Sequence, residues 1–174
     1  MSLLKVATMQ ETEGEVEEIF KEVESAFGAV TEGISLWALN PKALKFQWES
    51  IKEQMDNDED TQKMYTLIRY IVSEKNHCAY CIGLNGGMLI NMYGMSEDEL
   101  KEVSNDLSVA KLTSKNQMLL EFALRSINEP QSIQRKDIEE LHSLGLSDAE
   151  IFNLVLIASM MLVVNTLFDT FDVE

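Results

Sequence analysis

The sequence is poor in cysteine, proline and basic residues, and each shortage narrows what the protein can be. Two cysteines, two prolines and eight glycines occur in 174 residues, which excludes fibrous and disordered classes of protein. Lys and Arg number 14 against 30 Asp and Glu, so the formal net charge is −16. Because phosphate binding needs a basic stripe, this charge excludes nucleic-acid partners. Anionic membrane surfaces are disfavoured for the same reason.

The N-terminal residues also lack a charged-then-apolar leader with a cleavage site. We therefore expect a protein that stays in the cytoplasm, where the redox environment keeps thiols reduced. The length, with 45% hydrophobic residues, suits one domain with a substantial core, so we predict a single domain over residues 1–174. No strand pattern is visible, and the apolar periodicity predicts an all-α fold of about seven or eight helices.

Capping signals place the starts of several helices. Thr12 with Glu15, Ser96 with Glu99, and Ser147 with Glu150 have the spacing of a capping box. Asn40 before Pro41 predicts another helix start, and Asp60 is expected to cap the helix after it. The predicted helices cover residues 12–28, 40–55, 61–75, 79–92, a short stretch from 96, 114–128, 135–144 and 147–168, with a short buried piece at 33–39.

The last predicted helix is apolar nearly all the way round between Ile151 and Phe168. Such a helix must be buried on most sides, either at the centre of the domain or in a subunit interface. A transmembrane span is the competing interpretation, but the segment is marginal in length and carries Asn153 and Asn165. We therefore predict no membrane insertion. We predict self-association through this helix or through the helix that carries Gly83, Gly86 and Gly87, where glycine allows another backbone to approach closely.

The two cysteines, Cys78 and Cys81, form a C-x-x-C motif. This spacing places two sulfurs one helical turn apart, where they can close a disulfide or open to a dithiol. If a helix starts near His77, its unsatisfied N–H groups and the positive end of its dipole stabilise a thiolate there. Three interpretations remain open: a redox dithiol, a metal site, or two inert buried cysteines.

The metal interpretation is the weaker alternative to redox chemistry. Zinc sites usually need four ligands, and only His77 and His142 could add nitrogen to the two sulfurs. A calcium loop after Asp56 is incomplete because Thr61 and Leu67 stand where glycine and glutamate are needed. The glycines near Gly83 do not form a phosphate-binding motif. We expect no metal and no cofactor.

The residues around the cysteines also carry a family resemblance. Residues 72–81 contain the pattern V-S-x-x-N-x-C-x-Y-C, and further similarities are E-x-x-E-I-F-K-E-V near residue 15, G-M-S-E-D-E from Gly94, L-G-L-S-D-A-E-I from Leu144, and N-T-L-F from Asn165. Over nearly its whole length the chain resembles the alkylhydroperoxidase (AhpD-like) branch of the carboxymuconolactone decarboxylase family. It is similar to that branch's single-domain peroxidase-related members.

This resemblance implies an all-α fold that assembles as a dimer, trimer or hexamer. It implies that Cys81 attacks a small hydroperoxide and forms a sulfenic acid, which Cys78 resolves as a disulfide. A thiol or disulfide reductant then returns the electrons. A disulfide is the alternative substrate.

The chain departs from the family pattern at the two positions of a proton relay. Family members have a glutamate twelve residues before the first cysteine and a histidine four residues after the second, where this chain has Thr66 and Asn85. Neither side chain exchanges a proton near neutral pH. Glu74, Tyr70 and His77 are the nearby groups that could substitute.

The sequence thus predicts a slow thiol-dependent peroxidase or disulfide reductase. A cysteine thiol is partly ionised near neutral pH, so a relay improves the rate without being an absolute requirement. The alternative is a catalytically degenerate family member that acts as a binding or assembly module.

Overall fold

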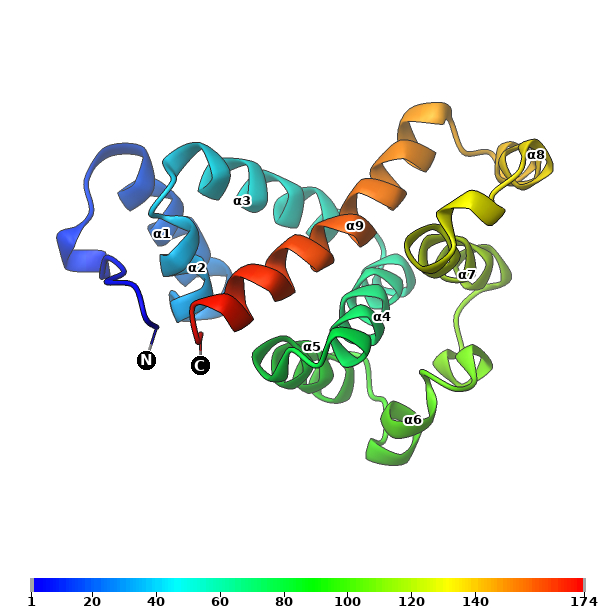
Figure 1. Ribbon diagram of the computed structural model, residues 1–174, viewed down its shortest axis with the longest axis horizontal. Helices are drawn as coiled ribbons and strands as arrows, with labels where there is room; N and C mark the ends of the chain where they lie inside the picture. Colours follow the sequence, from blue (N-terminus) through cyan, green and yellow to red (C-terminus); the bar gives the residue numbers. More distant parts are fainter. Residues whose placement is uncertain (1, 174) are drawn as a thin grey trace. The chain divides into compact units, whose positions relative to one another are not determined.

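The computed structural model describes residues 2–173, and the regular structure in this range is helical (Figure 1). It has nine α-helices: α1 (Gly14–Phe27), α2 (Glu32–Trp37), α3 (Pro41–Met55), α4 (Glu59–Asn76), α5 (Ala79–Asn91), α6 (Glu97–Glu102), α7 (Ser114–Asn128), α8 (Arg135–Ser143) and α9 (Asp148–Thr170). Three short 3₁₀ turns lie at Met9–Glu11, Leu107–Ala110 and Pro130–Ser132. The predicted all-α class is confirmed. The additional helix is α2, which the sequence indicated only as a short buried piece.

Backbone contacts divide the described residues into two compact units. Unit 1 holds the residues up to Asp56 together with those from Leu167 onward, and unit 2 holds Asn57–Thr166. Helix α9 thus belongs to unit 2 except for its last four residues. The single domain stays a prediction from the sequence.

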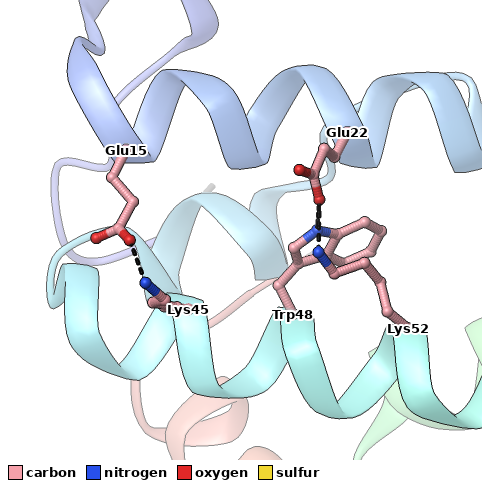
Figure 2. Close-up of polar contacts among 5 residues, drawn as sticks. All are labelled: Glu15, Glu22, Lys45, Trp48 and Lys52. Carbon is pink, nitrogen blue, oxygen red and sulfur yellow. Dashed lines mark hydrogen bonds and ion pairs between the residues drawn. The ribbon is translucent and has the colours of Figure 1, made fainter.

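Unit 1 is built on the packing of α1 against α3. Phe20 and Val23 on α1, and Leu44 and Trp48 on α3, are buried. Figure 2 shows the polar edge of this pair, where the Glu22 carboxylate accepts hydrogen bonds from the Trp48 indole N–H at 2.5 Å and from Lys52 at 2.8 Å.

A second ion pair and a backbone bond complete unit 1. Lys45 on α3 pairs with Glu15 on α1 at 2.6 Å. The Leu3 N–H donates to the Phe171 carbonyl at 2.8 Å, which ties the N-terminal residues to those that follow α9.

Unit 2 is organised around α4. Met64, Leu67 and Ile68 on α4 are fully buried, and α5 and α7 pack against this helix, with α5 beside it in Figure 1. These three apolar residues lie on one face of the helix. That apolar face explains why α4 forms and why it is buried inside unit 2.

The start of α4 corrects one prediction. Asp58, not Asp60, is the N-cap, because its side chain accepts from the Thr61 N–H at 3.1 Å. Asp60 instead accepts from the Thr113 hydroxyl at 2.7 Å and the Asn116 amide at 2.7 Å, which joins α4 to the start of α7. By local sequence either aspartate could cap the helix. Asp60 is instead bonded to Thr113, which lies 53 residues away, so Asp58 is the cap.

Other helix starts follow the predicted signals. Asn40 caps α3 through the Ala43 N–H, with Pro41 in the first helical position. Ser96 with Glu99 and Ser147 with Glu150 form reciprocal hydrogen bonds at the starts of α6 and α9. At α1 the prediction is wrong by one residue, because the N-cap is Glu13 and not Thr12.

Helix α9 is less buried than its sequence predicts. Only 39% of its most apolar window is buried, and Phe152 and Val163 are 66% and 46% exposed. The structure therefore does not bury α9 on most sides within this chain, and burial in a subunit interface stays a prediction. By length and composition alone, α9 is also the one helix among residues 2–173 that could cross a membrane.

At one position in α5, a glycine leaves room for neighbouring side chains to pack closely against the helix. A Cβ on Gly86 would lie 3.3 Å from Leu100 Cδ2 and 3.3 Å from Tyr70 Cε2. A Cβ on Gly83 would meet nothing within 4 Å. The expected close approach of another backbone is thus a close approach of two side chains, and it occurs at Gly86 only.

Candidate functional site

The turn between α4 and α5 places the two cysteines at a helix N-terminus. His77 has φ of 61°, the left-handed conformation that stops a helix, and its N–H donates to the Glu74 carbonyl at 3.1 Å. The Cys78 N–H donates to the Ser73 carbonyl at 3.1 Å, which completes a Schellman motif. Cys78 is then the N-cap of α5, and Cys81 is the third residue of that helix. The predicted helix start is confirmed.

A buried amide on α9 holds the end of α4 in place. Asn165 donates to the Ser73 hydroxyl at 3.0 Å and accepts from the Asn76 side chain at 2.9 Å. The Ser73 hydroxyl in turn donates to the Arg69 carbonyl at 2.7 Å. The serine and asparagine of the sequence pattern around the cysteines therefore support the turn from which Cys78 follows.

Both cysteine side chains are buried as thiols. Cys78 is 0% exposed and Cys81 is 2% exposed. They share one face of α5 with Asn85 and Leu89, which are also buried. A reagent from solvent therefore reaches either sulfur only when the structure opens locally, which differs from the accessible thiolate that the redox interpretation assumes.

The two relay positions meet at an arginine. The Arg69 Nε donates to Asn85 Oδ1 at 2.9 Å, and an Nη donates to the Thr66 hydroxyl at 2.8 Å. The Asn85 Nδ2 donates to the Cys81 carbonyl at 2.8 Å. Thr66, Asn85 and Cys81 are therefore connected through one guanidinium. Neither Thr66 nor Asn85 can carry a proton in exchange, so this arrangement is fixed polar support rather than a relay.

Arg69 keeps its charge at neutral pH. Burial lowers the pKa of its guanidinium to about 10, and the nearby Tyr93 opposes that change. The sequence analysis missed Arg69, although a signal was present. It lies three residues after Thr66 on α4, so the two share a helix face, and it is the one charged residue within the run Leu67–Val72.

The three proposed substitutes for the relay have other surroundings. The Tyr70 hydroxyl donates to Glu74 Oε1 at 2.9 Å, and Ser104 donates to the other oxygen of the same carboxylate. Burial, followed by the bond to Glu74, raises the pKa of Tyr70, so this hydroxyl keeps its proton at neutral pH. His77 is exposed in the turn. In their described hydrogen bonds, Tyr70 and Glu74 thus contact each other and Ser104.

An open hollow of about 480 Å³ lies on the surface of unit 1, whereas both cysteines belong to unit 2. It is lined by Lys21, Glu22, Ser25, Ala26, Trp48, Lys52 and Met55. Its charged groups already pair, Lys21 with Glu17 and Lys52 with Glu22. We therefore base the functional argument on the cysteines. Among residues 2–173, no three His, Cys, Asp or Glu side chains are grouped to hold a metal ion.

Comparison with known proteins identifies the fold. No protein-family model and no curated protein sequence matches the chain. A solved structure described as alkylhydroperoxidase AhpD core, an uncharacterized peroxidase-related protein from Ralstonia eutropha JMP134, aligns with a TM-score of 0.78 and 18% identity, over 99% of this chain and 91% of that one. An uncharacterized peroxidase-related protein from Silicibacter sp. TM1040 aligns with a TM-score of 0.74 and 19% identity, over the same shares. The chain has an AhpD-like fold.

Proposed function

We propose that this chain is a thiol-dependent peroxidase in which Cys81 attacks the substrate and Cys78 resolves the product. The observation that carries the proposal is the position of both thiols in the first turn of α5, within an AhpD-like fold. There the unsatisfied N–H groups and the helix dipole favour a thiolate. The name peroxidase-related, which both similar structures carry, supports a hydroperoxide as the substrate.

The reaction balances with the two thiols and one external reductant. The Cys81 thiolate attacks the terminal oxygen of ROOH, the O–O bond breaks, and the departing alkoxide takes a proton to become ROH. The Cys78 thiol then attacks the sulfenic sulfur of Cys81, and water leaves as the disulfide forms. A dithiol or disulfide reductant returns two electrons and restores both thiols.

Burial of the sulfurs favours a small hydroperoxide over a disulfide as the substrate. Disulfide exchange requires a second pair of sulfur atoms to approach the attacking sulfur, which a nearly closed site hinders. A small hydroperoxide needs a smaller opening. Because opening precedes attack, and Thr66 and Asn85 supply no proton relay, we expect slow turnover. We also propose that the protein acts in the cytoplasm and assembles as a homo-oligomer of two, three or six chains.

Hydroperoxide consumption by single-cysteine variants tests the proposal. The wild type with dithiothreitol should consume cumene hydroperoxide over many turnovers, and Cys81→Ser should lose this activity. Without a small thiol, Cys78→Ser should consume one equivalent and stop, because its sulfenic acid has no partner. If the wild type consumes no more than buffer, the protein is instead a degenerate member that serves as a binding or assembly module.

A further inference from the structure

One positive charge, that of Arg69, is hydrogen-bonded to the side chain of Asn85, which in turn donates to the Cys81 carbonyl. Arg69 is partly buried on α4, and two of its hydrogen bonds go to Thr66 Oγ1 and Asn85 Oδ1. In a chain of net charge −16, a cation held in such surroundings is unusual. These two hydrogen bonds fix the guanidinium, so its charge has a constant position relative to α5.

That position is close to the first turn of α5. Two hydrogen bonds, of 2.9 Å and 2.8 Å, and one amide group separate the guanidinium from the backbone of Cys81. The Asn85 amide is also polarised by the cation at its oxygen and by the Cys81 carbonyl at its nitrogen. A charge held at this separation in a partly buried region is less screened than one on the surface.

We infer that Arg69 is a positioning residue that stabilises the Cys81 thiolate by a fixed positive charge, in place of a proton relay. The inference rests on the proposed function, because it assigns the group that activates the same sulfur. A relay takes the proton from the thiol, whereas a fixed charge only makes the ionised form more stable. The thiolate then forms by exchange with solvent and persists to lower pH.

The other titratable groups near the site have described contacts away from Cys81 or are exposed. On α4, Glu74 is bonded to Tyr70 and Ser104, and Tyr93, which follows α5, lies near Arg69 itself. His77 is exposed in the turn. The charged residues of α7, which packs on α4, are also exposed: Lys115, Glu121 and Arg125.

The test measures the ionisation of Cys81 directly. In a Cys78→Ser background only one thiol remains, and its thiolate absorbs near 240 nm without needing a reagent to reach it. The pKa of Cys81 is read from this absorbance against pH in four proteins: the background, and the background with Arg69→Gln, Arg69→Lys or Lys63→Gln. Arg69→Gln removes the charge and keeps a donor, and Lys63→Gln makes the same charge change elsewhere on α4.

The inference predicts that Arg69→Gln raises the pKa of Cys81 by about one unit, which is about a tenfold loss of thiolate at a pH below both values. Arg69→Lys and Lys63→Gln should leave the pKa near that of the background. A pKa that is the same in Arg69→Gln and in the background overturns the inference. So does an equal rise in Lys63→Gln, because net charge would then explain it.

Two further measurements keep the test decisive. If Arg69→Gln does not fold, Arg69→Met replaces it, since it removes the charge, keeps an unbranched side chain and should also raise the pKa of Cys81. An unchanged pKa in that variant overturns the inference. Peroxide turnover is scored separately: a shifted pKa without turnover in the wild type refutes the proposed function alone, and turnover with an unshifted pKa refutes the inference alone.

Discussion

At the scale of single residues, the proposed chemistry depends on which side chains surround two sulfurs at the start of α5. Cys81 is connected through Asn85 to Arg69, which lies at neither of the two positions predicted for a relay. The groups predicted to replace the relay, Tyr70 and Glu74, bond to each other instead. In these described bonds a positive charge is connected to Cys81, and neither Thr66 nor Asn85 is a base that could accept a proton.

His77 illustrates how a residue beside a cysteine can have a backbone role. Its φ of 61° costs about 1 kcal/mol for a residue with a side chain, and glycine avoids that cost. We predict that His77→Gly raises the free energy of unfolding by about 1 kcal/mol and changes peroxide turnover less than twofold. Urea unfolding and the peroxide assay measure the two effects.

His77→Val serves as the opposite control, because a β-branched residue is a strong outlier at positive φ and should destabilise the protein. A large loss of turnover in a folded His77→Gly protein would show that the imidazole takes part in the chemistry after all.

At the scale of elements, α5 combines a weak helix sequence with a requirement for close packing. Gly83 and Gly86 both lie inside the helix, but only Gly86 has neighbours where a Cβ would stand. We predict that Gly83→Ala stabilises the protein by about 1 kcal/mol through helix propensity. Gly86→Ala should stabilise it less, because Tyr70 and Leu100 must move to make room. Equal gains from the two variants in urea unfolding would contradict this account of α5.

The joint between α4 and α7 depends on an ionised carboxylate. Burial raises the pKa of Asp60, but the hydrogen bonds from Thr113 and Asn116 outweigh burial and hold it below its usual 3.8. Its contribution to stability is therefore complete above the ordinary pKa. It declines as the pH falls below that value and is lost below the depressed pKa.

We predict that Asp60→Asn lowers the free energy of unfolding by about 1–2 kcal/mol at pH 6 and by less at pH 3. Thermal unfolding at both values measures the difference, with Asp56→Asn as a control carboxylate at the exposed end of α3. A gap between wild type and Asp60→Asn that does not shrink in acid would mean that the charge of Asp60 does not hold this joint.

The sequence predicts those elements whose signals are local. Asn40, Ser96 and Ser147 cap helices through residues three or four positions away, so their patterns are visible in the chain. Asp60 was misassigned because its partner Thr113 is distant in sequence. Arg69 was missed for a similar reason, since its bond to Asn85 exists only once α4 and α5 pack.

The burial of the cysteines was within reach of the sequence. Cys78, Asn85 and Leu89 recur at a helical spacing that indicates one face, and that face is buried. The C-x-x-C motif by itself does not show whether the sulfurs are accessible, whereas this spacing does indicate burial. The exposed side of α9 was not predictable, because an all-round apolar helix does not say which side its own chain covers.

At the scale of the whole molecule, the exposed apolar side chains of α9 bear on assembly. Phe152, Leu156, Leu162 and Val163 are exposed on a helix that the sequence predicted to be covered. We predict self-association, with a solution mass that is a multiple of 19.7 kDa. Light scattering over a dilution series measures it, and a mass of one chain at every concentration would contradict it.

A matched pair of variants tests whether the exposed apolar side of α9 forms the interface between chains. Phe152→Glu on α9 should weaken association by at least about tenfold, because it places a charge where an apolar ring would be covered. Phe46→Glu on α3, where a phenylalanine is also exposed, should leave association unchanged. Equal effects of the two variants would remove α9 from the interface.

The proposed function requires that the two buried thiols exchange electrons with peroxide. The direct measurement is the thiol count and intact mass of the folded protein before and after one equivalent of hydroperoxide. We predict the loss of both thiols and of two hydrogen atoms from the mass, with full recovery on dithiothreitol, and the gain of one oxygen in Cys78→Ser. Two thiols that survive peroxide unchanged in the folded wild type would contradict it.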